Sequence, residues 1–418
     1  MFSEASTPEL YGMAASPDSR KYNMRNRLLW GELYRRFPNR HGIALNFAIQ
    51  LWGAEVVDLL GKLLPDLVRR FPESVPLHTL WVEMALTWGD PAEAGRRAEV
   101  MLSRIEPNPK MLLHATQVYL AIGNFSAAAD IAARGLQSSG DAVFNYILPL
   151  VQRYEELRSQ WAGQSMRRDY HIYCVGLDRQ PRRFQRVQAQ LQRMGETVHL
   201  VSGVDGGTLP ELAARTLTHG ASGRMKGTLG CFLSHVRVWE LCASGDMPYA
   251  FVIEDDTCFV LPPPPAVASL ITGDEDFDLC FVNEGSQNIV YIPEKLPLDR
   301  PLSLERVLAT REEAFRGIGT YGYFVSREGA RKLLDMVAED GLVGDVDWRL
   351  LLYSVSGEAV DAVQNSFMSQ SFEFHNAHRK STGQLKAIMA PPPIVKTYNG
   401  GSIRSVMNDF SSAYEEVA

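Results

Sequence analysis

Short sequences in the first third of the chain recur after 34 residues, and this spacing constrains the fold strongly. Arg35-Arg-Phe-Pro38 returns as Arg69-Arg-Phe-Pro72, and Trp88-Gly-Asp90 returns in altered form as Ile122-Gly-Asn124. A period of this length is typical of helix pairs that turn at glycine and pack closely through small side chains. We predict two to three such repeats over residues 25–160. The small residues that keep the same spacing are Ala94 and Ala98, then Ala128 and Ala132.

The period and the Gly-Asp or Gly-Asn turn resemble the tetratricopeptide repeat. Stacked repeats of this kind bury one continuous core and offer a concave surface to a partner. We therefore expect the helical domain to recognise a protein, a peptide or a glycan, or to form a dimer. The alternative is that it only supports the domain that follows.

A second feature is the acidic run Glu254-Asp-Asp256, which directly follows the apolar run Tyr249-Ala-Phe-Val-Ile253. The apolar run predicts a buried strand, so the carboxylates are expected where that strand emerges. Carboxylate oxygens are the ligands that Mg²⁺ and Mn²⁺ prefer, and these ions bridge proteins to phosphate groups. A solvated turn or a helix cap is the alternative for such a cluster.

Patterns before the acidic run predict an open α/β sheet. Residues 171–177 are interpreted as a short strand, and residues 199–207 as a second short strand that runs into a glycine-rich turn. The apolar spacing between them is that of one helical face. In such sheets the ligand lies at the carboxyl ends of the strands. The turn Asp178-Arg-Gln-Pro-Arg-Arg183 brings arginines to a helix start, where they can pair with phosphate.

The segment from Lys226 to His235 is interpreted as a turn that leads into a largely buried helix. Ser234 is predicted to cap that helix, with a ligand role as the alternative. His235 fits a hydrogen-bonded structural residue better than a ligand, and Cys231 fits apolar packing. The aromatic-rich residues 321–325 predict a buried strand, although Tyr323 and Ser326 could line an acceptor cleft.

Taken in order, several blocks resemble glycosyltransferase family 25, the lipooligosaccharide and collagen galactosyltransferase group. The resemblance covers residues 168–385. Thr228 stands where the family usually has an acidic residue before its Gly-Cys pair, and Val346 where it often has proline. The matching blocks are Leu177-Asp-Arg with Arg182-Arg183, Gly230-Cys-Phe-Leu-Ser-His235 with Trp239, Ile253-Glu-Asp-Asp256, Gly319-Thr-Tyr-Gly-Tyr-Phe-Val-Ser-Arg-Glu-Gly-Ala330 and Val346-Asp347-Trp348.

The resemblance implies an α/β domain of the GT-A (Rossmann-like) type that transfers a sugar from a nucleoside diphosphate to a hydroxyl with inversion. Mn²⁺ or Mg²⁺ held by Glu254 and Asp256 would stabilise the leaving diphosphate. Asp347 is predicted to take the acceptor's proton, with Asp345 as the second choice. The predicted donor-binding residues are Leu177, Asp178, Arg179, Arg182, Arg183, Lys226, Ser234, His235, Glu254 and Asp255.

The family favours transfer of galactose from a UDP-sugar to a surface glycan such as lipopolysaccharide, at the inner face of the membrane. One alternative is transfer to a protein or peptide recruited by the helical repeats. An alternative of another class is a non-catalytic scaffold that binds a partner through those repeats. The irregular segment 286–316 is a candidate loop over the donor, whereas His375 and His378 lack the further ligands of a metal site.

Composition argues against some classes of protein and predicts the compartment. The net charge is −7, and the sequence offers no basic stripe that could neutralise phosphates. This argues against a general nucleic-acid binder. No apolar run approaches the roughly 18 residues of a membrane span. The five cysteines are an odd number without paired spacing, which predicts reduced thiols and a cytoplasmic protein. The expected order is a flexible tail over 1–24, helical repeats over 25–160, the GT-A-type domain over 168–390 and a tail over 391–418.

Overall fold

The structure is a computed structural model. It describes residues 2–20, 24–139, 142–162, 164, 168–218, 226–271, 276–283, 298–309, 319–358 and 383–397. These residues fall into two compact units, which divide between Phe144 and Asn145. The first unit is helical and the second is built on a mixed sheet, so the predicted fold class is confirmed.

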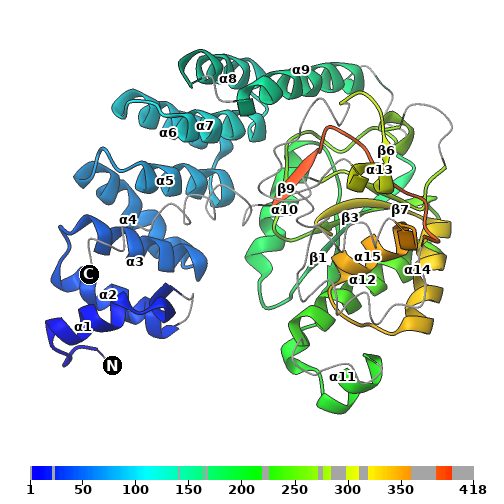
Figure 1. The fold of residues 1–418 in the computed structure, drawn as a ribbon, viewed down its shortest axis with the longest axis horizontal. Helices are drawn as coiled ribbons and strands as arrows, with labels where there is room; N and C mark the ends of the chain where they lie inside the picture. The colour runs from blue at the N-terminus through cyan, green and yellow to red at the C-terminus, as the bar shows by residue number, and fades with distance from the viewer. Residues whose placement is uncertain are drawn as a thin grey trace. The chain divides into compact units, whose positions relative to one another are not determined.

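The first unit is a series of antiparallel helices that follow one another as stacked pairs (Figure 1). The short 3-10 helix η1 (Pro17–Arg20) connects the first two. The α-helices are α1 (Thr7–Ala15), α2 (Met24–Arg36), α3 (His41–Gly53), α4 (Val57–Arg70), α5 (Val75–Trp88), α6 (Pro91–Arg104), α7 (Pro109–Ala121) and α8 (Phe125–Ser139).

The predicted period of 34 residues is the spacing at which equivalent helices begin. Helices α3, α5 and α7 begin 34 residues apart, and so do α4, α6 and α8. The turns are capped as the motif requires, because Asp90 accepts a hydrogen bond from the Ala92 amide (3.0 Å) and Asn124 from the Ala127 amide (3.2 Å). The repeated alanines are fully buried where paired helices approach, which confirms the predicted helical repeat: Ala94, Ala98, Ala128 and Ala132.

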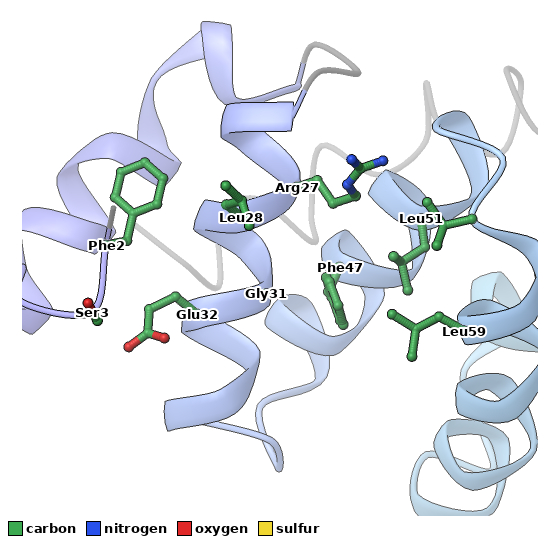
Figure 2. A pocket seen from close by; sticks show the side chains of 10 residues that line it. Phe2, Ser3, Arg27, Leu28, Gly31, Glu32, Phe47, Leu51 and Leu59 are labelled. Atoms are coloured by element: carbon green, nitrogen blue, oxygen red, sulfur yellow. The ribbon is translucent and has the colours of Figure 1, made fainter.

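An apolar hollow of about 540 Å³ lies in this helical unit, between α2 and the α3–α4 pair (Figure 2). Leu28 and Leu59 on its wall remain 45% and 47% exposed. Arg27 and Glu32 of α2 also line it. Every lining residue comes from the first 59 positions, so none of the predicted sugar-transfer residues contributes to this hollow.

The second unit holds a mixed sheet with the strand order β2-β1-β3-β7-β5-β8-β6. Strand β1 pairs in parallel with β2 and β3, and β7 runs antiparallel between β3 and β5. A second sheet pairs β4 (Thr257–Phe259) with β9 (Val395–Thr397). The strands of the main sheet are β1 (Tyr170–Gly176), β2 (His199–Ser202), β3 (Tyr249–Glu254), β5 (Leu279–Phe281), β6 (Leu302–Ser303), β7 (Gly322–Ser326) and β8 (Ala387–Met389).

The strand directions determine which residues lie together at one end of the sheet. The carboxyl ends of β1, β2 and β3 share one edge, and the residues that enter β7 lie at the same edge because β7 runs the opposite way. The acidic residues after β3 and the segment before β7 are thereby brought together, as expected for the ligand-binding edge of an α/β sheet.

Helices cover both faces of this sheet. Helices α12, α14 and α15 pack together (Figure 1) and share a core with Val252, Tyr323 and Val325. Helix α10 contacts β1 and β4, and Phe251 and Phe324 stack at 4.3 Å in an aromatic layer apart from that core. The helices are α9 (Ala142–Ala162), α10 (Pro181–Arg193), α11 (Glu211–Leu217), α12 (Lys226–Ser244), α13 (Leu304–Ala309), α14 (Arg327–Asp340) and α15 (Val346–Ser354), with 3-10 turns η2 (Gly206–Thr208) and η3 (Val267–Ser269).

The prediction of a turn at residues 226–235 is wrong, because this segment forms the first half of α12. Two glycines within four residues suggest a turn, but each has a place in the helix. Gly227 lies on an open side, and Gly230 lets the chain at Val204 and Gly206 pack directly against the helix. A Cβ at Gly230 would stand 2.4 Å from the Val204 carbonyl oxygen.

Replacing Gly230 with alanine is expected to destabilise the second unit by about 1–3 kcal/mol, because the added methyl overlaps backbone atoms. Gly227→Ala is the matched control in the same helix. Its Cβ meets no atom of the described residues within 4 Å, so it should be neutral or stabilising by up to about 1 kcal/mol. Thermal melting followed by circular dichroism compares the two. Equal melting temperatures would contradict the close approach at Gly230.

The predicted end of the helical domain at residue 160 falls within α9, most of which belongs to the second unit. Tyr154 of this helix donates a hydrogen bond to the Pro393 carbonyl (2.6 Å), which ties α9 to the segment before β9. Among the described residues, no helix is long and apolar enough to cross a membrane.

Candidate functional site

Three acidic side chains from distant parts of the sequence meet at the carboxyl edge of β3. Glu254 is the last residue of β3, Asp256 lies two residues further along the chain, and Asp347 lies in the first turn of α15. The Thr320 hydroxyl links two of them, since its Oγ1 lies 2.5 Å from Glu254 Oε1 and 2.8 Å from Asp347 Oδ1. The structure therefore brings together the predicted metal ligands and the predicted base.

Strand alternation sends the acidic residues to different faces. Val252 packs in the core beneath α12, so Glu254, two residues on, points to the same face. Asp255 points the other way, where the Arg183 guanidinium binds its carboxylate (3.0 Å) and Arg186 binds its carbonyl oxygen (2.6 Å). The middle member of the acidic run is thus engaged with α10.

Asp255 closes the acidic turn against β1. A Cβ added at Gly176, the last residue of β1, would lie 3.1 Å from the Asp255 side chain. Burial raises the pKa of Asp255, and the charge of Arg183 opposes that shift. This arrangement holds the turn in place and engages the Asp255 side chain on the side of β1 and α10.

Asp256 has a buried carboxylate oxygen, Oδ1. Its Oδ1 makes no hydrogen bond with any residue that the structure describes. Burial, and then the charge of Glu254, raises the pKa of Asp256 to about 7. A buried carboxylate without a donor is costly, and a cation would remove that cost.

Asp347 sits in the same electrostatic field. Burial, followed by the charge of Glu254, raises its pKa to about 7. Thr320 has only one hydroxyl proton, so it cannot donate to both carboxylates at once.

Glu254 remains the ionised member of this group. Burial acts to raise its pKa, but contacts with His235 and Thr320 outweigh burial, and the net shift is downward. His235 Nε2 lies 3.5 Å from Glu254 Oε1. The other ring nitrogen, Nδ1, lies 3.0 Å from the Tyr323 hydroxyl, which in turn accepts a hydrogen bond from Trp239 Nε1 (2.9 Å).

His235 and Tyr323 are both fully buried, so the prediction that His235 is a hydrogen-bonded residue is confirmed. It does not open a helix, because α12 begins at Lys226. The prediction that Ser234 caps a helix is wrong for the same reason. Ser234 instead donates to the Gly230 carbonyl (2.6 Å) and accepts from the Val204 amide (2.8 Å).

Tyr323 and Ser326 do not line a cleft. Tyr323 is part of the core, and Ser326 caps α14 by accepting a hydrogen bond from the Gly329 amide (2.9 Å). Cys231 packs partly buried against the same core, as predicted. The five cysteines form no disulfide, and four are buried.

The remaining predicted donor residues stand around the turn after β1. Asp178 accepts from the Ser202 hydroxyl (2.8 Å), and Arg179 pairs with Asp205 (2.8 Å), so both bind the turn after β2. Leu177 is half-buried and Arg182 is exposed on α10. The backbone of Lys226 begins α12, and its side chain lies outside the described structure.

Thr320 and Arg186 are functional candidates that sequence reasoning did not select. Thr320 lies within the quoted block Gly319-Thr-Tyr, directly before a strand, and a hydroxyl at that position was the available signal. Arg186 follows Arg183 by three residues, so both lie on one helical face. The candidate loop 286–316 is described only over 298–309, and His375 and His378 lie outside the described residues.

Comparison with known proteins agrees with this geometry. Residues 169–346 match the model of "Glycosyltransferase family 25 (LPS biosynthesis protein)". The match includes Glu254, Asp256 and Asp345 and ends one residue before Asp347.

Curated relatives match part of the chain. "Procollagen galactosyltransferase 2" of Homo sapiens is 26% identical over 174 residues, which are 39% of this chain and 27% of that protein. "Inactive glycosyltransferase 25 family member 3" of Homo sapiens is 35% identical over 98 residues, covering 21% of this chain and 16% of that protein. The chain thus spans little more than a quarter of the length of the first of these relatives, and less of the second.

Among solved structures, a thermophilic TPR protein of Thermus thermophilus covers 36% of this chain and 83% of its own, at 17% identity and a TM-score of 0.30. The helical repeats of this chain are identified by the 34-residue spacing of its own helices. The family match and the ordered motifs concern the second unit. Residues 169–346 are a glycosyltransferase family 25 domain.

Proposed function

We propose that this chain is a metal-dependent, inverting glycosyltransferase that uses a nucleoside diphosphate sugar, by default UDP-galactose. The observation that carries the proposal is the meeting of Glu254, Asp256 and Asp347 at one edge of the sheet, with the pKa of each aspartate raised to about 7. Carboxyl groups with such pKa values are typical of sites that bind cations or move protons near neutral pH.

The acidic residues fit a hard divalent ion. Glu254 and Asp256 offer carboxylate oxygens, and Oδ1 of Asp256 is buried without a partner among the described residues. Oxygen ligands of this kind suit Mn²⁺ or Mg²⁺. The ion would supply a Lewis acid for the diphosphate as it leaves. Asp255, held by Arg183 and Arg186, would keep the turn fixed during the reaction.

Asp347 is proposed as the base. The acceptor oxygen attacks the anomeric carbon, the bond from that carbon to the diphosphate oxygen breaks, and Asp347 takes the acceptor's proton. A single displacement of this kind inverts the anomeric centre. A base works best when its pKa lies near the operating pH, which is the position that burial and Glu254 give to Asp347. Asp345 remains the second candidate.

The predicted donor residues stay proposals of unequal strength. Arg179 and Arg182 are exposed around the start of α10, where a phosphate or the nucleotide can reach them. Arg183 is already bound to Asp255, so we assign it to positioning the acidic turn. Ser234 and His235 are buried within α12 and would act through their neighbours.

The acceptor is proposed from the comparisons. The matching family model is described as an LPS biosynthesis protein, which supports a surface glycan as the first choice. The relatives named procollagen galactosyltransferase support a protein or peptide as the second, and the helical repeats offer a surface to recruit it. The relative named inactive keeps a non-catalytic scaffold as the third.

A panel of nucleotide sugars tests the proposal. The purified chain is incubated with each sugar in Mn²⁺ or in EDTA, and free nucleoside diphosphate is measured. We expect release from one donor in Mn²⁺ and none in EDTA. If no donor is hydrolysed, binding of UDP with Mn²⁺ is measured by calorimetry. Absence of both hydrolysis and binding would contradict the transferase and favour the scaffold.

A further inference from the structure

A second set of metal-ligating atoms lies beside the acidic edge. Cys231 and His235 are four residues apart on α12 and share one helical face, which turns toward the end of β3. The Cys231 sulfur, a ring nitrogen of His235 and a carboxylate oxygen of Glu254 all lie within 4.8 Å of one another. Asp256 is not part of this set.

The ligand types differ from those of the proposed donor metal. Sulfur, imidazole nitrogen and carboxylate oxygen together select a borderline-soft ion such as Zn²⁺, whereas Mn²⁺ and Mg²⁺ prefer oxygen alone. Three protein ligands leave a fourth position open to water or to another small ligand.

His235 directs its Nε2 atom into this site. Its side chain is fully buried, and Nε2 makes no hydrogen bond with any described residue, although Glu254 Oε1 lies 3.5 Å away. The opposite nitrogen, Nδ1, lies 3.0 Å from the Tyr323 hydroxyl. A ligating histidine commonly donates its other ring N–H to such an oxygen, which fixes the ring and frees the lone pair of Nε2.

We propose that Cys231, His235 and Glu254 form a binding site for Zn²⁺ or a chemically similar ion, which overlaps the donor-metal site at Glu254. Binding releases the thiol proton of Cys231 to solvent and moves the ring proton of His235 to Nδ1, where the Tyr323 oxygen accepts it. The ion then takes Glu254 away from Asp256. Binding itself does not depend on the proposed transfer reaction, but its consequence, inhibition by Zn²⁺, rests on that proposed function.

Cobalt(II) is the probe, because a thiolate ligand gives bound cobalt an intense charge-transfer absorption that oxygen ligands do not give. The full chain, freed of metal, is titrated with cobalt and then with Zn²⁺. We expect one equivalent of cobalt to produce the band and Zn²⁺ to displace it. Absence of the band in the parent protein would overturn the proposal.

Cys231→Ser is the test variant and Cys242→Ser the matched control. Cys242 is buried on the same helix, but its thiol faces the Val325 carbonyl oxygen in the core. We expect Cys231→Ser to lose the band and at least about 100-fold in cobalt affinity, since even an outer partner of a metal site is worth roughly 10- to 100-fold. Cys242→Ser should keep both.

A band that persists in Cys231→Ser would overturn the assignment, and circular dichroism of both variants shows that each is folded. The titration needs no nucleotide sugar. A chain that hydrolyses no donor but binds cobalt through Cys231 would contradict the proposed transferase alone. A chain that hydrolyses a donor but shows no band would contradict the second metal site alone.

Discussion

Asp347→Asn is expected to lower the rate of sugar transfer by about 100- to 10,000-fold, because the amide cannot take the acceptor's proton. In the parent protein the rate should rise with pH, reach half its maximum near the pKa of about 7 of Asp347 and level off above it, since only the ionised form is a base. Initial rates across a pH series, with saturating donor and Mn²⁺, measure both effects.

Asp345→Asn is the matched control, two residues away at the start of α15. Asparagine has nearly the same size and shape as aspartate and is an equally good N-cap residue, so the change should leave the start of α15 intact. We expect a rate near that of the parent. A large loss in Asp345→Asn together with a near-normal rate in Asp347→Asn would reverse the two assignments.

The melting temperature of Asp347→Asn shows whether this variant loses activity through its chemistry or through unfolding. The pKa of Asp347 is raised in the folded state, so the folded chain keeps this proton while the unfolded chain releases it. The contribution of Asp347 to stability therefore falls as pH rises from about 4 to about 7 and stays low above. Without added metal, Asp347→Asn should melt a few degrees higher than the parent at about pH 8 and little differently at about pH 4.

Asp256→Asn is expected to lower metal-dependent release of nucleoside diphosphate by about 100- to 1,000-fold, the scale of losing one preorganised group that stabilises a developing charge. The buried Oδ1 of Asp256 is the oxygen without a partner among the described residues, and neutralising the carboxylate removes its attraction for a cation. The Mn²⁺ concentration for half-maximal rate should rise as well. A titration of rate against Mn²⁺ measures both.

Asp246→Asn provides the comparison for that change. Asp246 lies just before β3, at the opposite end of the strand, where it is exposed and pairs with His171 (3.1 Å). Removing its charge should leave the Mn²⁺ dependence unchanged. If Asp256→Asn and the parent need the same Mn²⁺ concentration, Asp256 is not a ligand.

Local sequence identified the strands because β1 and β3 carry strong apolar runs that end in polar residues. It also placed the acidic run at a strand end, since the apolar residues before it could only be buried. The helical face of α10 followed from its spacing, and Val187 and Leu191 are fully buried as that spacing predicts.

Other positions depended on neighbours that no local pattern shows. Ser234 looked like a helix cap because Gly227 and Gly230 suggested a turn, but the helix continues through them where the chain at Val204 packs closely. Asp255 is acidic like its neighbours in the sequence, and only the structure shows that Arg183 and Arg186 hold it on the opposite face from Glu254.

The sequence alone determined the helical repeat, whose period of 34 residues is a local property of each helix pair and its turn. It also determined that the acidic residues lie where β3 ends. Only the tertiary structure decided that Thr320, 66 residues from Glu254, joins it to Asp347. The antiparallel run of β7 brings that hydroxyl to the edge where β3 ends, and strand pairing between distant segments is set by the packing of the whole sheet.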